Sequence, residues 1–164
     1  MKRKSYRQLL AIFRKLNAVD PESWARSESE EGIPQLASYL FLRQAWRNGV
    51  IEDGDIAWID DARRSAKREP DAPLAGIGHA LNRLLAKGVD KRDVAEVVRG
   101  MQYETLFALC YLLSDPGELE AEVADVRWSL FECDENGSPA RPMDGLHEST
   151  LTTDPTGREM RPKP

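Results

Sequence analysis

The chain changes character at Asp115-Pro116-Gly117, and this break constrains the fold more than any other feature. Before it, apolar residues recur at the three- and four-residue spacing of amphipathic helices. After it, residues 127–133 have the composition of a strand, and residues 134–137 follow with favourable turn chemistry. The sequence therefore predicts a mainly α-helical protein that carries a small C-terminal β-hairpin.

Five or six helices are expected in the first part of the chain. Ser5 and Gln8 match a capping box, in which each side chain satisfies a free backbone amide of the first helical turn. The acidic segment 22–32 forms either a loop or a short helix. The other expected ranges are residues 5–18, residues 34–48, a helix from 53 or 55, a helix from 71 to 88, and a helix from 90 that Gly100 kinks or divides from a buried helix at 103–114.

Two glycines lie inside the fourth predicted helix, which Asp71 is expected to cap. Gly76 and Gly78 each cost about 1 kcal/mol relative to alanine in a helix interior. Such a cost indicates that a neighbouring helix approaches closely at this place. The apolar stripe that we expect this helix to bury consists of Leu74, Ile77, Leu81, Leu84 and Leu85.

Length and composition predict a single compact domain over residues 1–151, with the hairpin at about 127–151. Pro139 and Pro142 indicate a long connection, so residues 144–152 are the expected second strand. This register places Cys133 opposite Asp144 and His147 opposite Leu130. Residues 152–164 are rich in proline and polar side chains, and they predict an extended tail.

Charge is distributed unevenly along a chain whose net charge is −5. Residues 1–18 carry six basic side chains and no acidic ones, whereas residues 115–135, which we name the acidic arm, carry eight acidic side chains against Arg127 alone. The acidic overall balance and the absence of interleaved aromatic residues argue against nucleic-acid binding by the basic helix. A solvated or internally paired basic face is the favoured interpretation.

No pattern in the sequence indicates a cofactor, and no spacing of histidine and cysteine indicates a metal site. Cys133 and His147 are the only candidates for a nucleophile and its base, but the predicted register points them to opposite faces. His79 lies across the helix from the apolar stripe, where a solvated side chain is expected. We therefore predict no catalytic residues.

Two tryptophans lie beside acidic residues. An exposed aromatic ring surrounded by carboxylates suits the binding of a cationic partner, although burial against the body is the favoured alternative for Trp128. Trp24 lies in the acidic segment 22–32, where no local role is evident for residues 28–31. The predicted partner-binding residues are Trp24, Glu28, Glu30, Glu31, Glu118, Glu120, Glu122 and Trp128.

These observations favour a non-enzymatic protein that binds a basic protein partner, such as an inhibitor or immunity-type protein acting on a cationic toxin or nuclease. One alternative is a small enzyme or ligand-binding protein in which Glu30, Glu31, His79 and His147 converge. A second is a subunit that self-associates through a surplus apolar stripe at residues 103–113. The longest apolar run has eight residues and no export signal is evident, so we expect a cytoplasmic protein with reduced cysteines and no membrane span.

Overall fold

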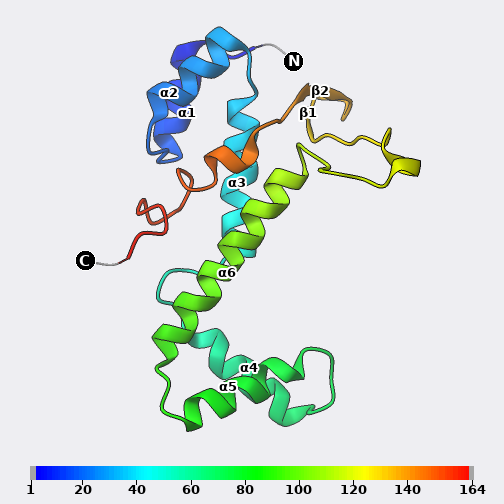
Figure 1. The fold of residues 1–164 in the computed structure, drawn as a ribbon. Helices are drawn as coiled ribbons and strands as arrows, with labels where there is room; N and C mark the ends of the chain where they lie inside the picture. The colour runs from blue at the N-terminus through cyan, green and yellow to red at the C-terminus, as the bar shows by residue number, and fades with distance from the viewer. Residues whose placement is uncertain (1–2, 163–164) are drawn as a thin grey trace. The chain divides into compact units, whose positions relative to one another are not determined.

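The computed structural model describes residues 3–162, which form six α-helices and one two-stranded antiparallel sheet (Figure 1). The predicted mainly α-helical fold with a C-terminal hairpin is confirmed. Contacts divide the chain into two compact units, residues 1–49 with 104–164 and residues 50–103. We describe each unit by itself.

The first unit begins with α1 (Tyr6–Lys15), α2 (Pro21–Arg26), a π-helical turn (Ser27–Glu31) and α3 (Gln35–Gly49). The predicted capping box is present, because Ser5 accepts from the backbone of Gln8 and the Gln8 side chain accepts from the Ser5 amide at 2.9 Å. Asp20 caps α2 in the same way by accepting from the Ser23 amide. Residues 22–32, for which the sequence predicts either a loop or a short helix, are therefore helical as far as Glu31.

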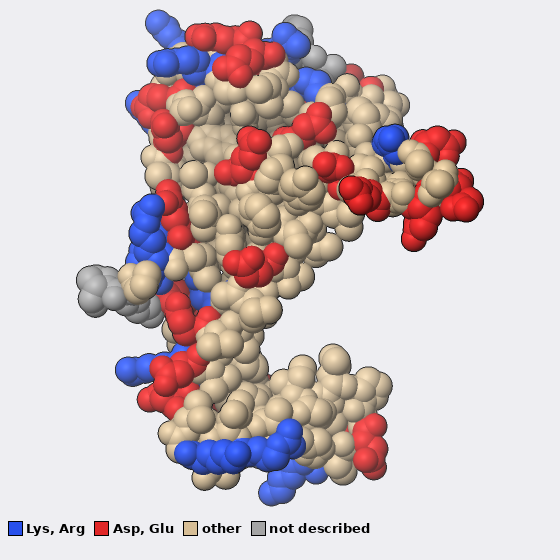
Figure 2. Space-filling model, viewed as in Figure 1, with Lys and Arg blue, Asp and Glu red and all other residues tan. Residues whose placement is uncertain are grey.

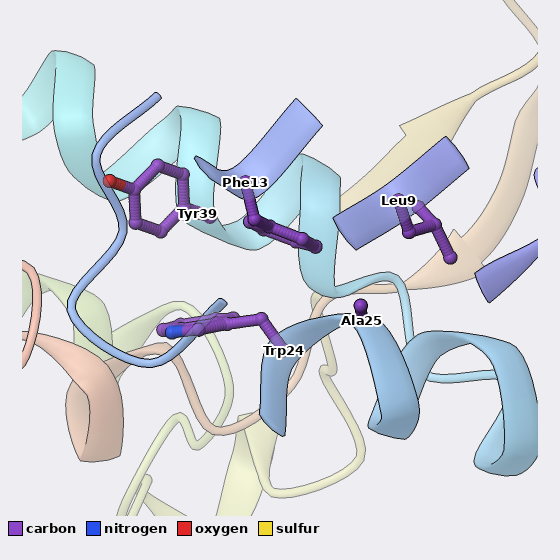
Figure 3. Close-up of a cluster of buried hydrophobic side chains, with 5 residues drawn as sticks. All are labelled: Leu9, Phe13, Trp24, Ala25 and Tyr39. Carbon is purple, nitrogen blue, oxygen red and sulfur yellow. The ribbon is translucent and has the colours of Figure 1, made fainter. Parts of the chain in front are cut away.

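Aromatic rings from three helices form the core of this part of the unit. Phe13 of α1, Trp24 of α2 and Tyr39 of α3 point toward one another (Figure 3), with ring centroids 5.4 to 5.9 Å apart. Leu9 and Ala25 complete the cluster and are fully buried. Edge-to-face packing of aromatic rings contributes about 0.5–1.5 kcal/mol per pair beyond burial, so these contacts hold the three short helices together.

A second core cluster joins α3, the end of α6 (Lys91–Leu112) and the chain after the hairpin. It consists of Leu42, Cys110, Met143 and Leu146. Trp46 of α3 also donates from its indole nitrogen to the carbonyl of Thr150 at 2.9 Å. Segments that lie about a hundred residues apart in sequence are thereby packed into one unit.

The hairpin pairs β1 (Phe131–Cys133) with β2 (Pro139–Pro142). The predicted register is wrong, because Phe131 pairs with Pro142 and Cys133 with Pro139. The connection is short because the Asp134 carboxylate accepts from the amides of Asn136 and Ser138 and folds the turn on itself. Proline is tolerated in β2 because both strands of a two-stranded sheet are edge strands. The predicted second strand instead contains a 3₁₀ helix, Leu146–Ser149.

Residues 151–160 form turns where the sequence predicts an extended tail. Asp154 is buried, and its carboxylate accepts from the amides of Thr156 and Met160 and from the Thr156 hydroxyl. One buried carboxylate can thus organise a segment that has few apolar residues of its own. The last two residues of the predicted tail, 163 and 164, lie outside the described residues.

The second unit contains α4 (Ala57–Arg68), α5 (Ala75–Ala86) and the first part of α6. A Cβ added at Gly78 of α5 would lie 2.4 Å from the Ala62 carbonyl oxygen and 2.5 Å from the Ala66 Cβ of α4. The predicted close helix approach is confirmed at Gly78. At Gly76 it is not, because an added Cβ would meet no atom within 4 Å.

Two details of α5 and α6 differ from expectation. The predicted cap at Asp71 is wrong, because residues 69–74 form turns and α5 begins at Ala75. Gly100 does not divide α6, which is continuous from Lys91 to Leu112. Among the described residues, no helix has the length and apolar character needed to cross a membrane.

Candidate protein-binding surface

The acidic arm follows α6 and begins with a turn at residues 115–117. Gly117 has a left-handed φ of 69°, and Asp115 accepts from the Gly117 amide at 2.8 Å and from the Tyr111 hydroxyl at 3.2 Å. Ala121–Val123 then form a single 3₁₀ turn. These contacts hold the start of the arm against the end of α6.

Four exposed carboxylates of the arm lie within residues 118–125, and a fifth, Glu135, is exposed in the hairpin turn. They form no hydrogen bond or ion pair with any other residue that the structure describes. Figure 2 shows the acidic side chains gathered on this segment. The four are Glu118, Glu120, Glu122 and Asp125.

Three other acidic residues of the arm have internal roles. Asp115 and Asp134 accept backbone hydrogen bonds, and Glu132 is paired with Arg141. Hydrogen bonds from the amides of Ser138 and Asn136 lower the pKa of Asp134. The uncompensated charge is therefore concentrated in residues 118–125.

Trp128 follows these carboxylates in the sequence and keeps 39% of its surface exposed. Its indole nitrogen donates to the carbonyl of Leu112 at 2.6 Å, so the ring is held against the end of α6 and stays partly exposed. Val123 and Val126 are also exposed. A partly exposed tryptophan that is held in place is a residue type from which binding hot spots are commonly formed.

The other predicted surface residues lie apart in sequence on α2 and the π-helical turn. Trp24 is 8% exposed and belongs to the aromatic core, so its ring is not available at the surface. Glu30 and Glu31 are exposed, and Glu31 accepts from the hydroxyl of Ser27 at 3.3 Å. Burial of Trp24 has a physical cause, since α2 packs its ring against Phe13 and Tyr39.

Glu28 has a structural role that the sequence did not indicate. Its carboxylate accepts from the Leu36 amide at 2.6 Å and pairs with Arg141 at 2.9 Å. Arg141 also pairs with Glu132 and donates to the carbonyl of Gly32 at 3.0 Å. Hydrogen bonds to Glu132 and then to Glu28 raise the pKa of Arg141 despite partial burial. Local spacing carries no signal for this network, because Glu28 and Arg141 are 113 residues apart.

The candidate nucleophile and base have different surroundings. Cys133 is exposed on β1, while the His147 ring contacts Tyr111 and Phe107 with centroids 4.9 and 5.7 Å away. No hydrogen bond joins Cys133 to His147 in the described part of the chain. Cys110 is buried, and burial raises the pKa of its thiol to about 11.

The remaining candidate residues have separate contacts. His79 contacts the carbonyl of Pro70 at 3.0 Å and belongs to residues 50–103. Within residues 3–162, no three histidine, cysteine, aspartate or glutamate side chains are grouped as metal ligands would be. On the basic first helix, Arg14 pairs with Glu22 at 2.6 Å.

Comparison with family models, with curated proteins and with solved structures finds no match for this chain.

Proposed function

We propose that this chain is a non-enzymatic interaction protein that binds a basic protein partner through its acidic arm. The observation that carries the proposal is the run of exposed carboxylates at Glu118, Glu120, Glu122 and Asp125, which lack partners among the described residues. An inhibitor that covers a cationic surface of an enzyme is one role of this kind.

Electrostatics supports this choice of partner. Like charges placed within a few residues of each other repel, and a cationic surface relieves that repulsion when it binds. Charge of one sign concentrated on an exposed segment also raises association rates, by about 10-fold to 1,000-fold at low salt. The arm therefore favours a partner with clustered lysine or arginine side chains.

Trp128 supplies the apolar contact that such a surface needs. Charged residues at an interface rim contribute mainly to association rate and specificity, whereas aromatic anchors contribute much of the affinity. The hydrogen bond from the Trp128 indole to Leu112 holds the ring before binding. Little side-chain entropy is then lost when a partner covers it.

The test begins with affinity capture from native lysate at low salt, followed by identification of a stoichiometric basic protein. Binding kinetics are then measured for the charge-reversal variant E118K/E120K/E122K. We expect its association rate to fall by about tenfold or more at low salt, with a smaller difference at high salt. The variant W128A is expected to accelerate dissociation instead.

A matched control variant distinguishes an effect of the acidic arm from an effect of net charge. The variant E52K/E69K/E96K changes the net charge by the same amount at exposed positions of residues 50–103. We expect it to bind at nearly the wild-type rate. Equal association rates for the wild type and the arm variant would show that the arm does not bind the partner.

A further inference from the structure

The chain contains two Asn–Gly pairs, Asn48–Gly49 and Asn136–Gly137. An asparagine that precedes glycine is prone to spontaneous deamidation, because glycine has no Cβ to obstruct ring closure and its backbone rotates freely. The other two asparagines, Asn17 and Asn82, precede alanine and arginine. The two Asn–Gly pairs are therefore matched in sequence, and the structure around each pair decides which of them reacts.

Deamidation is an intramolecular acyl transfer. The main-chain nitrogen of the glycine loses its proton and attacks the asparagine Cγ, a new N–Cγ bond closes a succinimide ring, and the side-chain amide leaves as ammonia after taking up a proton. Water then opens the ring at either carbonyl and gives aspartate or isoaspartate, so the reaction consumes water, releases ammonia and needs no oxidant or reductant. The ring closes only when rotation about the asparagine Cα–C bond brings the nitrogen against Cγ. The backbone around the pair therefore controls the rate.

The backbone around Asn136 has few restraints. Asn136 and Gly137 lie in the turn between β1 and β2, and every residue from 135 to 140 is exposed. The Asn136 side chain forms no hydrogen bond with another residue that the structure describes. The attacking Gly137 amide has a single restraint in the described part of the chain, a hydrogen bond of 3.1 Å to the Asp134 carbonyl. One hydrogen bond in an exposed turn opens at a low free-energy cost.

The backbone around Asn48 is held by a helix. Asn48 and Gly49 are also exposed, but they lie in the last turn of α3, where helical geometry directs the Gly49 amide toward the preceding turn. The Asn48 side-chain nitrogen donates to the Gln44 carbonyl at 2.7 Å. Trp46 is 2% exposed and donates to the Thr150 carbonyl, which anchors this end of α3. Ring closure at Asn48 therefore requires local unwinding of the helix.

We propose that Asn136 is a modification site, at which the folded protein converts asparagine to aspartate and isoaspartate without an enzyme, and that the fold protects Asn48 from the same reaction. Exposure does not distinguish the two asparagines, because both are exposed. The difference arises from what must open before the ring closes. At Asn136 this is the hydrogen bond from Gly137 to Asp134, whereas at Asn48 it is the last turn of α3 together with a side-chain hydrogen bond.

Modification changes the hairpin turn in two ways. Both products add a negative charge next in sequence to Glu135, at the end of the acidic arm. Isoaspartate also lengthens the main chain by one carbon between positions 136 and 137. The Asp134 carboxylate accepts from the amides of Asn136 and Ser138 at 2.8 and 3.0 Å, so the longer chain moves the Ser138 amide away from its acceptor. The isoaspartyl form therefore has a looser turn than the unmodified chain.

The test incubates the full native chain at mildly alkaline pH and follows each Asn–Gly pair by peptide mass mapping, with digestion at acidic pH to suppress further reaction. Fragmentation that cleaves N–Cα bonds distinguishes isoaspartate from aspartate. We expect Asn136 to convert faster than Asn48 by about tenfold or more, because the helix must lose several hydrogen bonds before the ring can close. The variant N136Q should lack the fast conversion, because glutamine would have to close a six-membered ring.

The chain unfolded in guanidinium chloride is the matched control, since it keeps both Asn–Gly pairs and removes the fold. We expect Asn48 and Asn136 to react at similar rates in the unfolded chain. Equal rates at the two asparagines in the native chain, or faster conversion at Asn48, would overturn the proposal. A native chain in which Asn136 stays unconverted while the unfolded chain reacts would overturn it as well, because the turn would then protect Asn136.

Discussion

Arg141 and Glu28, which are 113 residues apart in the chain, form an ion pair with a nitrogen–oxygen distance of 2.9 Å. The pair joins β2 to the π-helical turn after α2, and Glu132 of β1 shares the same guanidinium. The side chains of Arg141 and Glu28 are only 19% and 11% exposed. The hairpin is therefore attached to the helical part of its unit by ion pairs that are largely shielded from water.

Removal of Arg141 should destabilise the protein strongly. The variant R141M leaves two largely buried carboxylates without a cation, and breaking a buried pair in this way costs about 3–5 kcal/mol. We expect a loss of about 3 kcal/mol in the free energy of unfolding, measured by urea titration. The control is R14M, whose exposed pair with Glu22 contributes less than about 1 kcal/mol. Equal effects of R141M and R14M would show that burial does not strengthen the pair.

The variant G78A should separate α4 from α5. Its Cβ would lie 2.4 Å from a backbone oxygen of Ala62, which cannot move without displacing the helix. Overpacking of this kind costs about 1–3 kcal/mol, which exceeds the gain of about 1 kcal/mol in helix propensity. Thermal unfolding of G78A should therefore occur at a lower temperature than that of the wild type. G100A, whose Cβ meets no atom within 4 Å, should raise it slightly.

The thiol of Cys110 makes stability depend on alkaline pH. Burial raises its pKa from 9.0 to about 11, so the folded state favours the neutral thiol. The stabilisation is complete below pH 9 and is lost as pH rises toward 11, because the unfolded chain releases its proton first. We expect the free energy of unfolding to fall by up to about 1.4 kcal/mol per pH unit in this window. The variant C110A should show a shallower fall.

The same difference in burial predicts selective alkylation. Cys133 is exposed and Cys110 is buried, so one equivalent of iodoacetamide should react with the native protein and a second only after unfolding. Mass spectrometry of the digested protein identifies the modified residue. Fast modification of Cys110 in the native state would contradict its place in the core.

Asp154 should control the order of residues 151–160. Its buried carboxylate accepts from two amides and one hydroxyl of that segment, and D154A leaves those donors without their acceptor. Hydrogen exchange at the Thr156 and Met160 amides should become faster by about tenfold or more, because each lost hydrogen bond contributes about 1 kcal/mol or more. Exchange within α1 should stay unchanged.

Much of the fold could be predicted because helix signals are local. The capping box at Ser5 and Gln8 involves contacts over three residues, and the observed α1 begins where it indicates. The cost of a glycine inside a helix likewise pointed to the close approach that Gly78 makes. The composition of residues 127–133 placed a strand there, but the prolines of β2 led to the wrong partner strand. Prediction of the pairing failed because the turn depends on which backbone amides donate to the Asp134 carboxylate, and the sequence does not show this.

The candidate surface was predictable only in part. The exposed carboxylates of the acidic arm follow from composition, because uncompensated charges stay in water. Trp24 and Glu28 have neighbours as acidic as those of the arm, yet the structure covers one with Phe13 and Tyr39 and pairs the other with Arg141. Exposure of Ile77 and Leu84 on α5 also could not be predicted, since periodicity shows which face of a helix is apolar but not what covers it.

The sequence by itself determined most of the helical segments, where most of them begin and end, and where charge accumulates, because these properties depend on residues within about one turn of each other. Tertiary structure alone decided the hairpin register, the burial of Trp24, the pairing of Glu28 with Arg141 and the exposure of α5. Each of these depends on contacts between residues far apart in the chain, and such contacts form only when the packed helices bring them together.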